Sequence, residues 1–249
     1  MRILLTLLLC VLFISVQAQE TIFTDRPNVT DAVNVLNKGT MQVEVGYLNS
    51  TTDFGTSEVT FSTIPNFSFK YGLTDRVELR LLTNYGVLDS PGQDNISGLT
   101  PITFSPKFFL IEQDGIIPKA SVTTAFTFSD TGEEAFQVED LNYNFRLLFE
   151  YQFNKLTWTN SIGYDFLDND NSALAYTTVL GYPITDKLGS FVELYGFGES
   201  DTSDAAQNLD FGFTYLVSNK LQIDAIYGFN IDDNADSTIF GFGFGYKIN

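Results

Sequence analysis

The sequence predicts an all-β protein, and more narrowly an antiparallel transmembrane β-barrel of about 12 strands with short periplasmic turns and longer acidic extracellular loops. Segments of about ten residues place apolar or aromatic side chains at every second position, which gives a strand one apolar and one polar face. These segments follow one another to the last residue. Only a closed ring of such strands turns its apolar face to lipid without leaving backbone groups unpaired.

The first residues have the pattern of an export signal. Residues 1–2 supply a positive charge, residues 3–16 are almost wholly apolar, and residues 16–18 are suited to cleavage. A membrane-spanning helix is the alternative, but the apolar stretch falls short of the roughly twenty residues that cross a bilayer. We therefore expect residues 1–18 to be a signal peptide that is cleaved. The single cysteine, Cys10, lies in it, so the mature chain would have no disulfide and no thiolate metal site.

The composition is that of a protein with much apolar surface. Charged residues make up 18% of the chain, against roughly a quarter in ordinary soluble domains, and aromatic residues make up 15%. The formal net charge is −18 without clustered Lys and Arg, which argues against nucleic acid as a partner. Histidine is absent, which removes Ser-His-Asp catalysis and His-based zinc sites. We expect no enzyme, no cofactor and no metal site.

Twelve segments have the strand period. In the first, Val43 and Val45 alternate with the polar Glu44, and the others repeat this arrangement. Pro65 and Pro106 weaken their strands, because proline cannot donate to a ladder, so we expect a bulge at each. The predicted strands cover residues 40–48, 59–71, 76–85, 102–110, 120–128, 141–151, 156–166, 174–182, 190–197, 209–215, 221–230 and 238–248.

The connections between these strands alternate in kind. After even-numbered strands they are short, at residues 72–75, 112–115, 154–155, 185–187 and 218–220. After odd-numbered strands they are longer and acidic, as at Glu133 with Glu134 and Asp232 with Asp233. An outer-membrane barrel has this asymmetry, with both termini on the periplasmic side. We therefore expect residues 39–249 to form a barrel in a cell outer membrane.

Aromatic residues mark both rims of the expected barrel, where ring side chains fit between hydrocarbon and headgroups. A soluble lipocalin-like barrel or a β-sandwich would also alternate, but its polar face would meet water and carry many charges. Here that face is mainly Thr, Ser, Gly and Asn. One rim has tyrosine at positions 71, 151, 182, 215 and 246, and the other has Tyr47, Tyr85, Phe128, Tyr164, Phe166, Phe197 and Phe229.

The facing of the strand at residues 190–197 stays open. Phe191, Glu193 and Tyr195 share one parity of this strand, whereas Val192 and Leu194 share the other. Both sets contain large apolar side chains, so the period alone does not decide which one meets lipid.

The polar parity of the strands points into the lumen and carries charges of both signs. Twelve strands exceed the number whose side chains alone fill the interior, so a narrow channel or a plugged cavity is expected. Residues 19–38 are polar and lack a clean period, so they are the candidate for a periplasmic or lumen-plugging segment whose Asp25 and Arg26 pair with lumen charges. The lumen charges either pair across a closed interior or line a wet passage. The charged residues assigned to the lumen are Glu44, Lys70, Glu78, Arg80, Lys107, Lys119, Arg146, Glu150, Asp165, Asp210, Asp224 and Lys247.

The chain also resembles a known family. The run Thr-Asp-Arg-Pro at residues 24–27, followed by Lys38-Gly39 and residues 42–47, resembles the opening of the outer-membrane transporter family named for the meta pathway of phenol degradation. Residues 71–79 match its first turn, and the strand with Lys107 fits its next segment. The resemblance covers most of the mature chain. It implies a β-barrel that passes hydrophobic or aromatic small molecules, an assignment that rests largely on genetic neighbourhood.

Two functions from different classes fit these observations. The first is passive passage of a small solute through the lumen, with the inward charges setting preference and residues 19–38 restricting the bore. The second is a sealed structural or surface-interaction barrel whose acidic loops bind divalent cations, lipopolysaccharide or a partner. Outer-membrane lipid and the barrel-assembly machinery are further expected partners. Conductance in planar bilayers separates the two functions.

Overall fold

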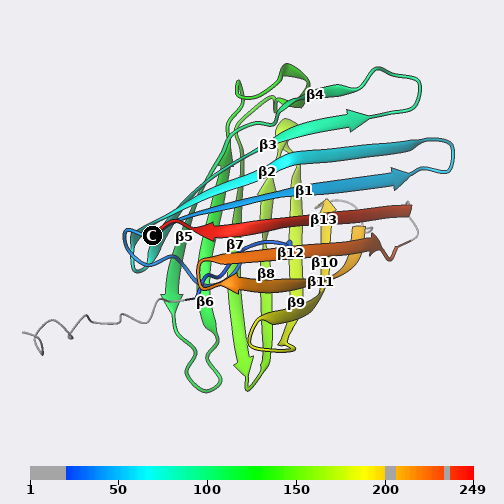
Figure 1. Ribbon diagram of the computed structural model, residues 1–249. Coiled ribbons are helices and arrows are strands. Elements are labelled where there is room, and N and C mark those ends of the chain that lie inside the picture. Colours follow the sequence, from blue (N-terminus) through cyan, green and yellow to red (C-terminus); the bar gives the residue numbers. More distant parts are fainter. Residues whose placement is uncertain (1–20, 200–205, 233–235) are drawn as a thin grey trace, which may run out of the picture.

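The chain folds into one closed antiparallel sheet. The computed structural model describes residues 21–199, 206–232 and 236–249, and the predicted signal peptide at residues 1–18 lies outside them. The sheet closes because β2 (Glu58–Thr74) pairs with β1 (Met41–Asp53) on one side and with β3 (Val77–Asp89) on the other. The strands of the front wall cross those of the rear wall steeply, as tilted strands of a barrel do (Figure 1). The other strands are β4 (Ile96–Leu99), β5 (Thr103–Ile111), β6 (Lys119–Thr127), β7 (Asn142–Phe153), β8 (Leu156–Phe166), β9 (Ser172–Pro183), β10 (Leu188–Glu199), β11 (Ala206–Ser218), β12 (Leu221–Asn230) and β13 (Asp236–Lys247).

The ring has twelve positions, which confirms the strand number predicted from the sequence. The sheet contains thirteen strands, but β4 and β5 both pair with β3 along different parts of its length. They share one position, and thirteen less one gives twelve. Pro101 lies in the break between them, where the N–H of Thr100 still donates to Asn84 O at 2.8 Å. The predicted strand at residues 102–110 corresponds to β5.

The outer face of the barrel is apolar, whereas the inner face is mainly small or polar, with a few apolar side chains such as Phe191 and Ile226. In β13, Phe240, Phe242 and Phe244 are 47%, 51% and 39% exposed, while Gly241 and Gly245 between and beside them are buried. The same alternation holds in β11 and β12. An exposed aromatic band of this extent is unfavourable in water and favourable in hydrocarbon.

The short turns and the C-terminus lie at one end of the barrel, at the lower left in Figure 1, and the longer connections lie at the other end. The first long connection is shorter than expected, because β1 and β2 continue as a hairpin to residues 54–57. Polar cross-strand contacts extend this ladder, with Thr51 Oγ1 3.1 Å from Thr60 Oγ1 and Asn49 Nδ2 donating to Ser62 Oγ at 2.9 Å. The apolar alternation had ended earlier, so the period marked only the part of each strand that faces the band.

Two short 3-10 helices, η1 (Glu134–Phe136) and η2 (Asp168–Asp170), lie in the long connections. The connection with η1 bends back over β2 and β4, because Glu133 N–H donates to Leu99 O at 2.7 Å and the Phe136 ring packs 5.8 Å from that of Phe61. In the part of the chain that the structure describes, no helix is both long and apolar enough to cross a membrane.

The two prolines behave differently from each other. The register of β2 shifts between Thr63 and Asn66 against both neighbouring strands, which confirms the bulge expected at Pro65. The bulge expected at Pro106 is wrong, because Pro106 pairs with Leu79 of β3 in unbroken register. The ladder from β5 to β6 passes residues 105–106 without an extra residue and shifts only after Phe109. Residues 105–106 do not pair with β6, so the N–H that Pro106 lacks is not needed by that ladder and no bulge forms.

The facing of β10 is settled by burial. Phe191, Glu193 and Tyr195 point into the lumen and are buried, whereas Val192 is exposed on the outer face. Glu193 is therefore an additional lumen carboxylate.

Candidate functional site: the lumen and the segment inside it

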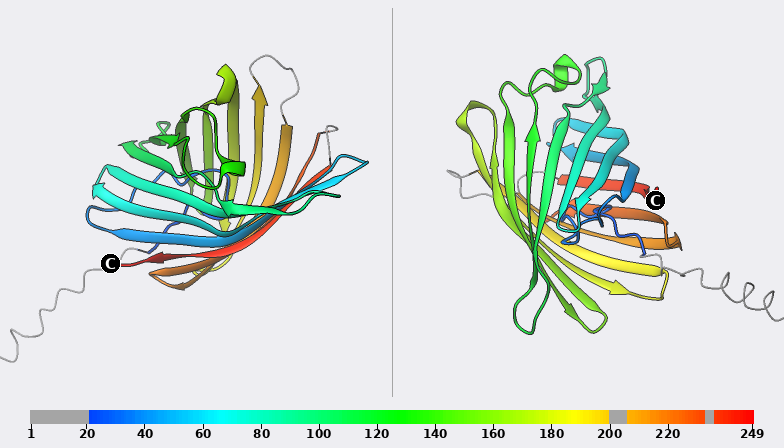
Figure 2. Two further views of the ribbon diagram at one scale, coloured as in Figure 1. Left: turned by 90° about the horizontal axis from the view of Figure 1, so that it is seen from above. Right: turned by 90° about the vertical axis from the view of Figure 1, so that its left-hand side faces the viewer.

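Residues 21–38, here called the lumen segment, run inside the barrel before β1 begins (Figure 2). The segment contains no strand or helix. Its apolar side chains Ile22, Val33 and Leu36 are buried, and Ile22 N–H donates to Asn219 O at 2.8 Å at the short-turn end. An extended chain without a ladder must find other acceptors for its N–H groups.

Carboxylates of the wall supply these acceptors. Glu44 on β1 accepts the N–H groups of Asp25 and Arg26, both at 3.2 Å. Glu193 on β10 accepts the N–H groups of Val29 and Thr30 at 2.8 and 2.7 Å and the Thr30 hydroxyl at 2.5 Å. In the same way Glu78 on β3 accepts Leu36 N–H at 2.9 Å. All three glutamates are at most 1% exposed, so these charge-assisted bonds are shielded from water.

Asp25 is the acidic centre of the segment. Its carboxylate contacts Lys70 Nζ at 2.5 Å, Lys107 Nζ at 3.0 Å and Arg80 Nη1 at 3.2 Å. Lys70, Arg80 and Lys107, here called the basic cluster, come from the neighbouring strands β2, β3 and β5 and are at most 5% exposed. Burial alone would raise the pKa of Asp25, but the positive charges of Lys107, Lys70 and Arg80 hold that pKa well below its ordinary value.

Arg26 points to the other side of the lumen. Its guanidinium contacts Asp224 on β12 at 3.1 Å and donates to Asn66 Oδ1 at 3.1 Å. Gly46 on β1 and its cross-strand partner Gly243 on β13 leave room for this group. A Cβ at Gly243 would lie 2.6 Å from Arg26 Nη2, and one at Gly46 would overlap the guanidinium itself. These two glycines therefore shape the lumen to fit one side chain.

The basic cluster makes further ion pairs, and the remaining lumen charges form smaller groups. Asp31 contacts Arg80 at 2.7 Å, and Lys107 lies 3.8 Å from Glu78. Further pairs are Lys119 with Glu150 at 3.4 Å, Lys119 Nζ with Asn34 Oδ1 at 3.1 Å, and Arg146 with Asp165 at 2.6 Å. Lys247 is half-buried at the end of β13.

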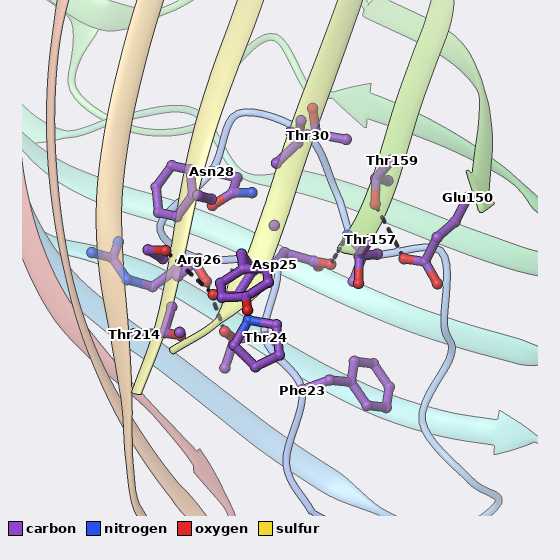
Figure 3. Close-up of a pocket in the computed structure, with 18 of the residues that line it drawn as sticks. Phe23, Thr24, Asp25, Arg26, Asn28, Thr30, Glu150, Thr157, Thr159 and Thr214 are labelled. Atoms are coloured by element: carbon purple, nitrogen blue, oxygen red, sulfur yellow. Dashed lines mark hydrogen bonds between the residues drawn. The ribbon is translucent and has the colours of Figure 1, made fainter. Parts of the chain in front are cut away.

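Among the cavities that the lumen segment lines, two lie on either side of residues 25–31. The first, of about 510 Å³, lies toward the short turns, and the second, of about 280 Å³, lies toward the long connections. Asp25, Arg26, Asn28 and Asp31 line both. Figure 3 shows Asp25 and Arg26 beside the first cavity, with Thr159 of the wall donating to Glu150 at 3.1 Å. Residues 25–31 are thus the partition between two spaces within one lumen.

The structure brings most of the sequence-assigned charges together around this partition. Asp25 contacts the basic cluster, and Arg26 contacts Asp224. Two ion pairs lie apart from Asp25, namely Lys119 with Glu150 and Arg146 with Asp165. Glu193 was missed because two parities of β10 carried apolar side chains. A charge at the centre of a strand was the available signal, since it is costly on the lipid face. In the described ranges, no group of three or more His, Cys, Asp or Glu side chains could hold a metal ion.

The closed barrel, its apolar outer band and its charged lumen define an outer-membrane β-barrel protein, located in the outer membrane. The chain belongs to the family described as "Putative MetA-pathway of phenol degradation", whose model matches residues 24–248. The resemblance seen from residues 24–27 onward is thereby confirmed.

Solved structures with this fold come from outer-membrane proteins. An outer membrane channel from Pseudomonas putida F1 matches with a TM-score of 0.70 at 14% identity, over 87% of this chain and 98% of that chain. The NanC porin matches with a TM-score of 0.57 at 8% identity, over 82% and 100%. The translocator domain of the autotransporter NalP from Neisseria meningitidis gives 0.55 at 12% identity, over 86% and 90%. Identities this low establish the fold alone. No curated protein matches the sequence.

Proposed function

We propose that this protein is an outer-membrane channel that passes small solutes through its lumen, with the lumen segment as the constriction. The observation that carries this proposal is the pair of cavities on either side of residues 25–31. Side chains would fill the whole cross-section of a sealed barrel. Here, residues 25–31 alone separate the two spaces. Displacing that stretch would join them.

The charges around the partition support a polar passage. The basic cluster lies on β2, β3 and β5, while Glu193, Asp210 and Asp224 lie on β10, β11 and β12, on the other side of the ring. Opposed charges across a narrow lumen produce a transverse field that orders water and orients dipolar solutes. The charges of the lumen segment are arranged to match those of the wall, because Asp25 faces the basic cluster and Arg26 faces Asp224.

The size of the cavities supports solutes of small-molecule size. The first cavity, of about 510 Å³, falls within the usual range of small-molecule sites, and the second, of about 280 Å³, lies just below it. The family description names phenol degradation, and we extend it to this chain as a proposal that aromatic compounds are among its solutes. The barrel-assembly machinery, lipid and lipopolysaccharide are proposed as its partners in the membrane.

Conductance in planar bilayers tests the channel. We expect small, noisy currents from the full chain and larger, steadier ones after deletion of residues 19–38, because the partition is then gone. Liposome swelling with solutes of increasing size gives the bore. A folded barrel that passes neither ions nor solutes after the deletion would refute the channel and favour the sealed barrel. In that case, neutralising Glu133, Glu134, Asp232 and Asp233 should abolish surface binding of divalent cations or lipopolysaccharide.

A further inference from the structure

The geometry points to a binding site for a small carboxylate on the inner wall, formed by the basic cluster and filled here by the side chain of Asp25. Asp25 then acts as a tethered copy of the ligand, and a solute carboxylate must displace it to bind. This inference rests on the proposed function, since it names a class of solute for the proposed channel.

The wall meets both oxygens of the Asp25 carboxylate. Oδ2 contacts Lys70 Nζ at 2.5 Å and Arg80 Nη1 at 3.2 Å, while Oδ1 contacts Lys107 Nζ at 3.0 Å. Oδ1 also accepts the N–H of Ala32 at 2.9 Å, which belongs to the segment itself. The three cations come from three neighbouring strands, so they stay together when the segment moves. Three convergent donors for one carboxylate are more than a single structural ion pair requires.

The charge balance of the wall requires one anion. The basic cluster carries three positive charges, and the wall acids in contact with it, Glu44 and Glu78, carry two negative charges. Asp25 and Asp31 both belong to the segment and leave with it. Three less two leaves one net positive charge facing the space that the segment vacates, and this charge attracts an anion. A solute with a single carboxylate would restore neutrality.

The cavities give such a solute access and room for an apolar body. Asp25 lines both cavities, and Arg80 of the basic cluster lines the second, so withdrawal of Asp25 opens the cluster to a carboxylate in that cavity. The second cavity is lined by Leu48, Ile226 and Ile239, and the first by Phe23 and Phe191. The ligand class is therefore a small monocarboxylate with an apolar or aromatic body.

Competition between the solute and Asp25 gives a direct test in the full chain. In a Cys10→Ala background, Asn28→Cys places one thiol on the segment at a residue that lines both cavities. Its rate of reaction with a small maleimide reports withdrawal of the segment. We expect millimolar benzoate to raise that rate about tenfold, because it binds only the wall freed by the segment. Benzyl alcohol and benzylammonium at the same ionic strength should leave the rate unchanged.

Variants of the wall locate the effect. Lys107→Gln should remove most of the benzoate response, whereas the matched change Lys119→Gln should retain it, because Lys119 pairs with Glu150 and Asn34 instead of Asp25. If Lys107→Gln fails to fold, Asp25→Asn replaces it, and the labelling rate without benzoate should then be higher than in the native segment, because the competing carboxylate is gone. Equal rates with benzoate, benzyl alcohol and benzylammonium in a folded protein would overturn the inference.

The test separates this inference from the proposed function. A chain that conducts ions but shows no preference for the carboxylate probe would retain the channel and lose the binding site. A chain that responds to benzoate but carries no current after deletion of residues 19–38 would retain the site and lose the channel.

Discussion

Replacing Gly46 by alanine should release the lumen segment. The three heavy atoms nearest to a Cβ at Gly46 all belong to the guanidinium of Arg26, so the added methyl group acts first on that side chain. Arg26 would have to leave Asp224, which is 0% exposed at its side chain, and would also lose its bond to Asn66. The carboxylate of Asp224 would then be buried without its partner.

The size of this effect follows from the burial of the pair. Breaking a buried ion pair by removing one partner costs about 3–5 kcal/mol, and screening is weak because Arg26 is 12% exposed. Rearrangement of the segment recovers part of this, so we take about 3 kcal/mol against the lumen-bound state. At about 1.4 kcal/mol per factor of ten, the population with a withdrawn segment rises about a hundredfold.

Two measurements check this expectation. The maleimide reaction at Asn28→Cys should accelerate in the Gly46→Ala background, and the open fraction in planar bilayers should increase with it. Gly181→Ala is the matched control, because Gly181 is a wall glycine that lines the first cavity and its Cβ would lie 3.8 Å from the nearest atom, Thr157 Cβ. Identical labelling and conductance in the two variants would mean that the pair between Arg26 and Asp224 does not hold the segment.

Three further outcomes are expected. Because the pKa of Asp25 is lowered in the lumen-bound segment, its charge favours binding above its ordinary pKa and ceases to do so as the pH falls through the lowered value. The ratio of maleimide rates between Asp25→Asn and the native segment should thus stay constant from about pH 8 to about pH 5 and shrink below about pH 4, whereas a change near neutral pH would contradict the assigned cause. Phe213→Lys places a charge on the outer face, which costs about 2–4 kcal/mol in hydrocarbon, so this variant should insert poorly into liposomes. Thr214→Lys faces the lumen and should insert normally. Equal insertion yields would contradict the assignment of Phe213 to the lipid-facing side. Arg146→Gln leaves Asp165 without its ion-pair partner, at a place away from the lumen segment. The reversal potential in a salt gradient should therefore shift toward cation preference, while labelling at residue 28 stays as slow as before. An unchanged reversal potential would mean that these two residues do not line the ion path.

The fold was predictable because a single physical rule governs most of the chain. Lipid on one side and a polar lumen on the other impose a two-residue period, and that period assigned residues such as Lys70 and Asp224 to the lumen. The rule stops where lipid stops. Near residues 54–57, β1 and β2 are held by polar contacts such as Thr51 with Thr60. Polar side chains stand on both faces there, so the sequence shows no alternation of apolar and polar residues.

The site was predictable only in part. Asp25 and Arg26 were expected to pair with lumen charges, but their separate partners depend on where the segment runs. The path of a segment without a period is fixed by the acceptors of the wall, and one of these, Glu193, lies on the strand whose facing the period left open. The role of Gly243 in admitting Arg26 was not predictable either, because it depends on the pairing of β13 with β1.

The wall carboxylates Glu44, Glu78 and Glu193 hold the segment mainly through its main-chain amides. Amide groups are the same in every residue except proline, so this mode of attachment is insensitive to which side chain follows which. Positions such as Val29 can therefore vary in evolution without detaching the segment, whereas a proline there would delete an anchor outright.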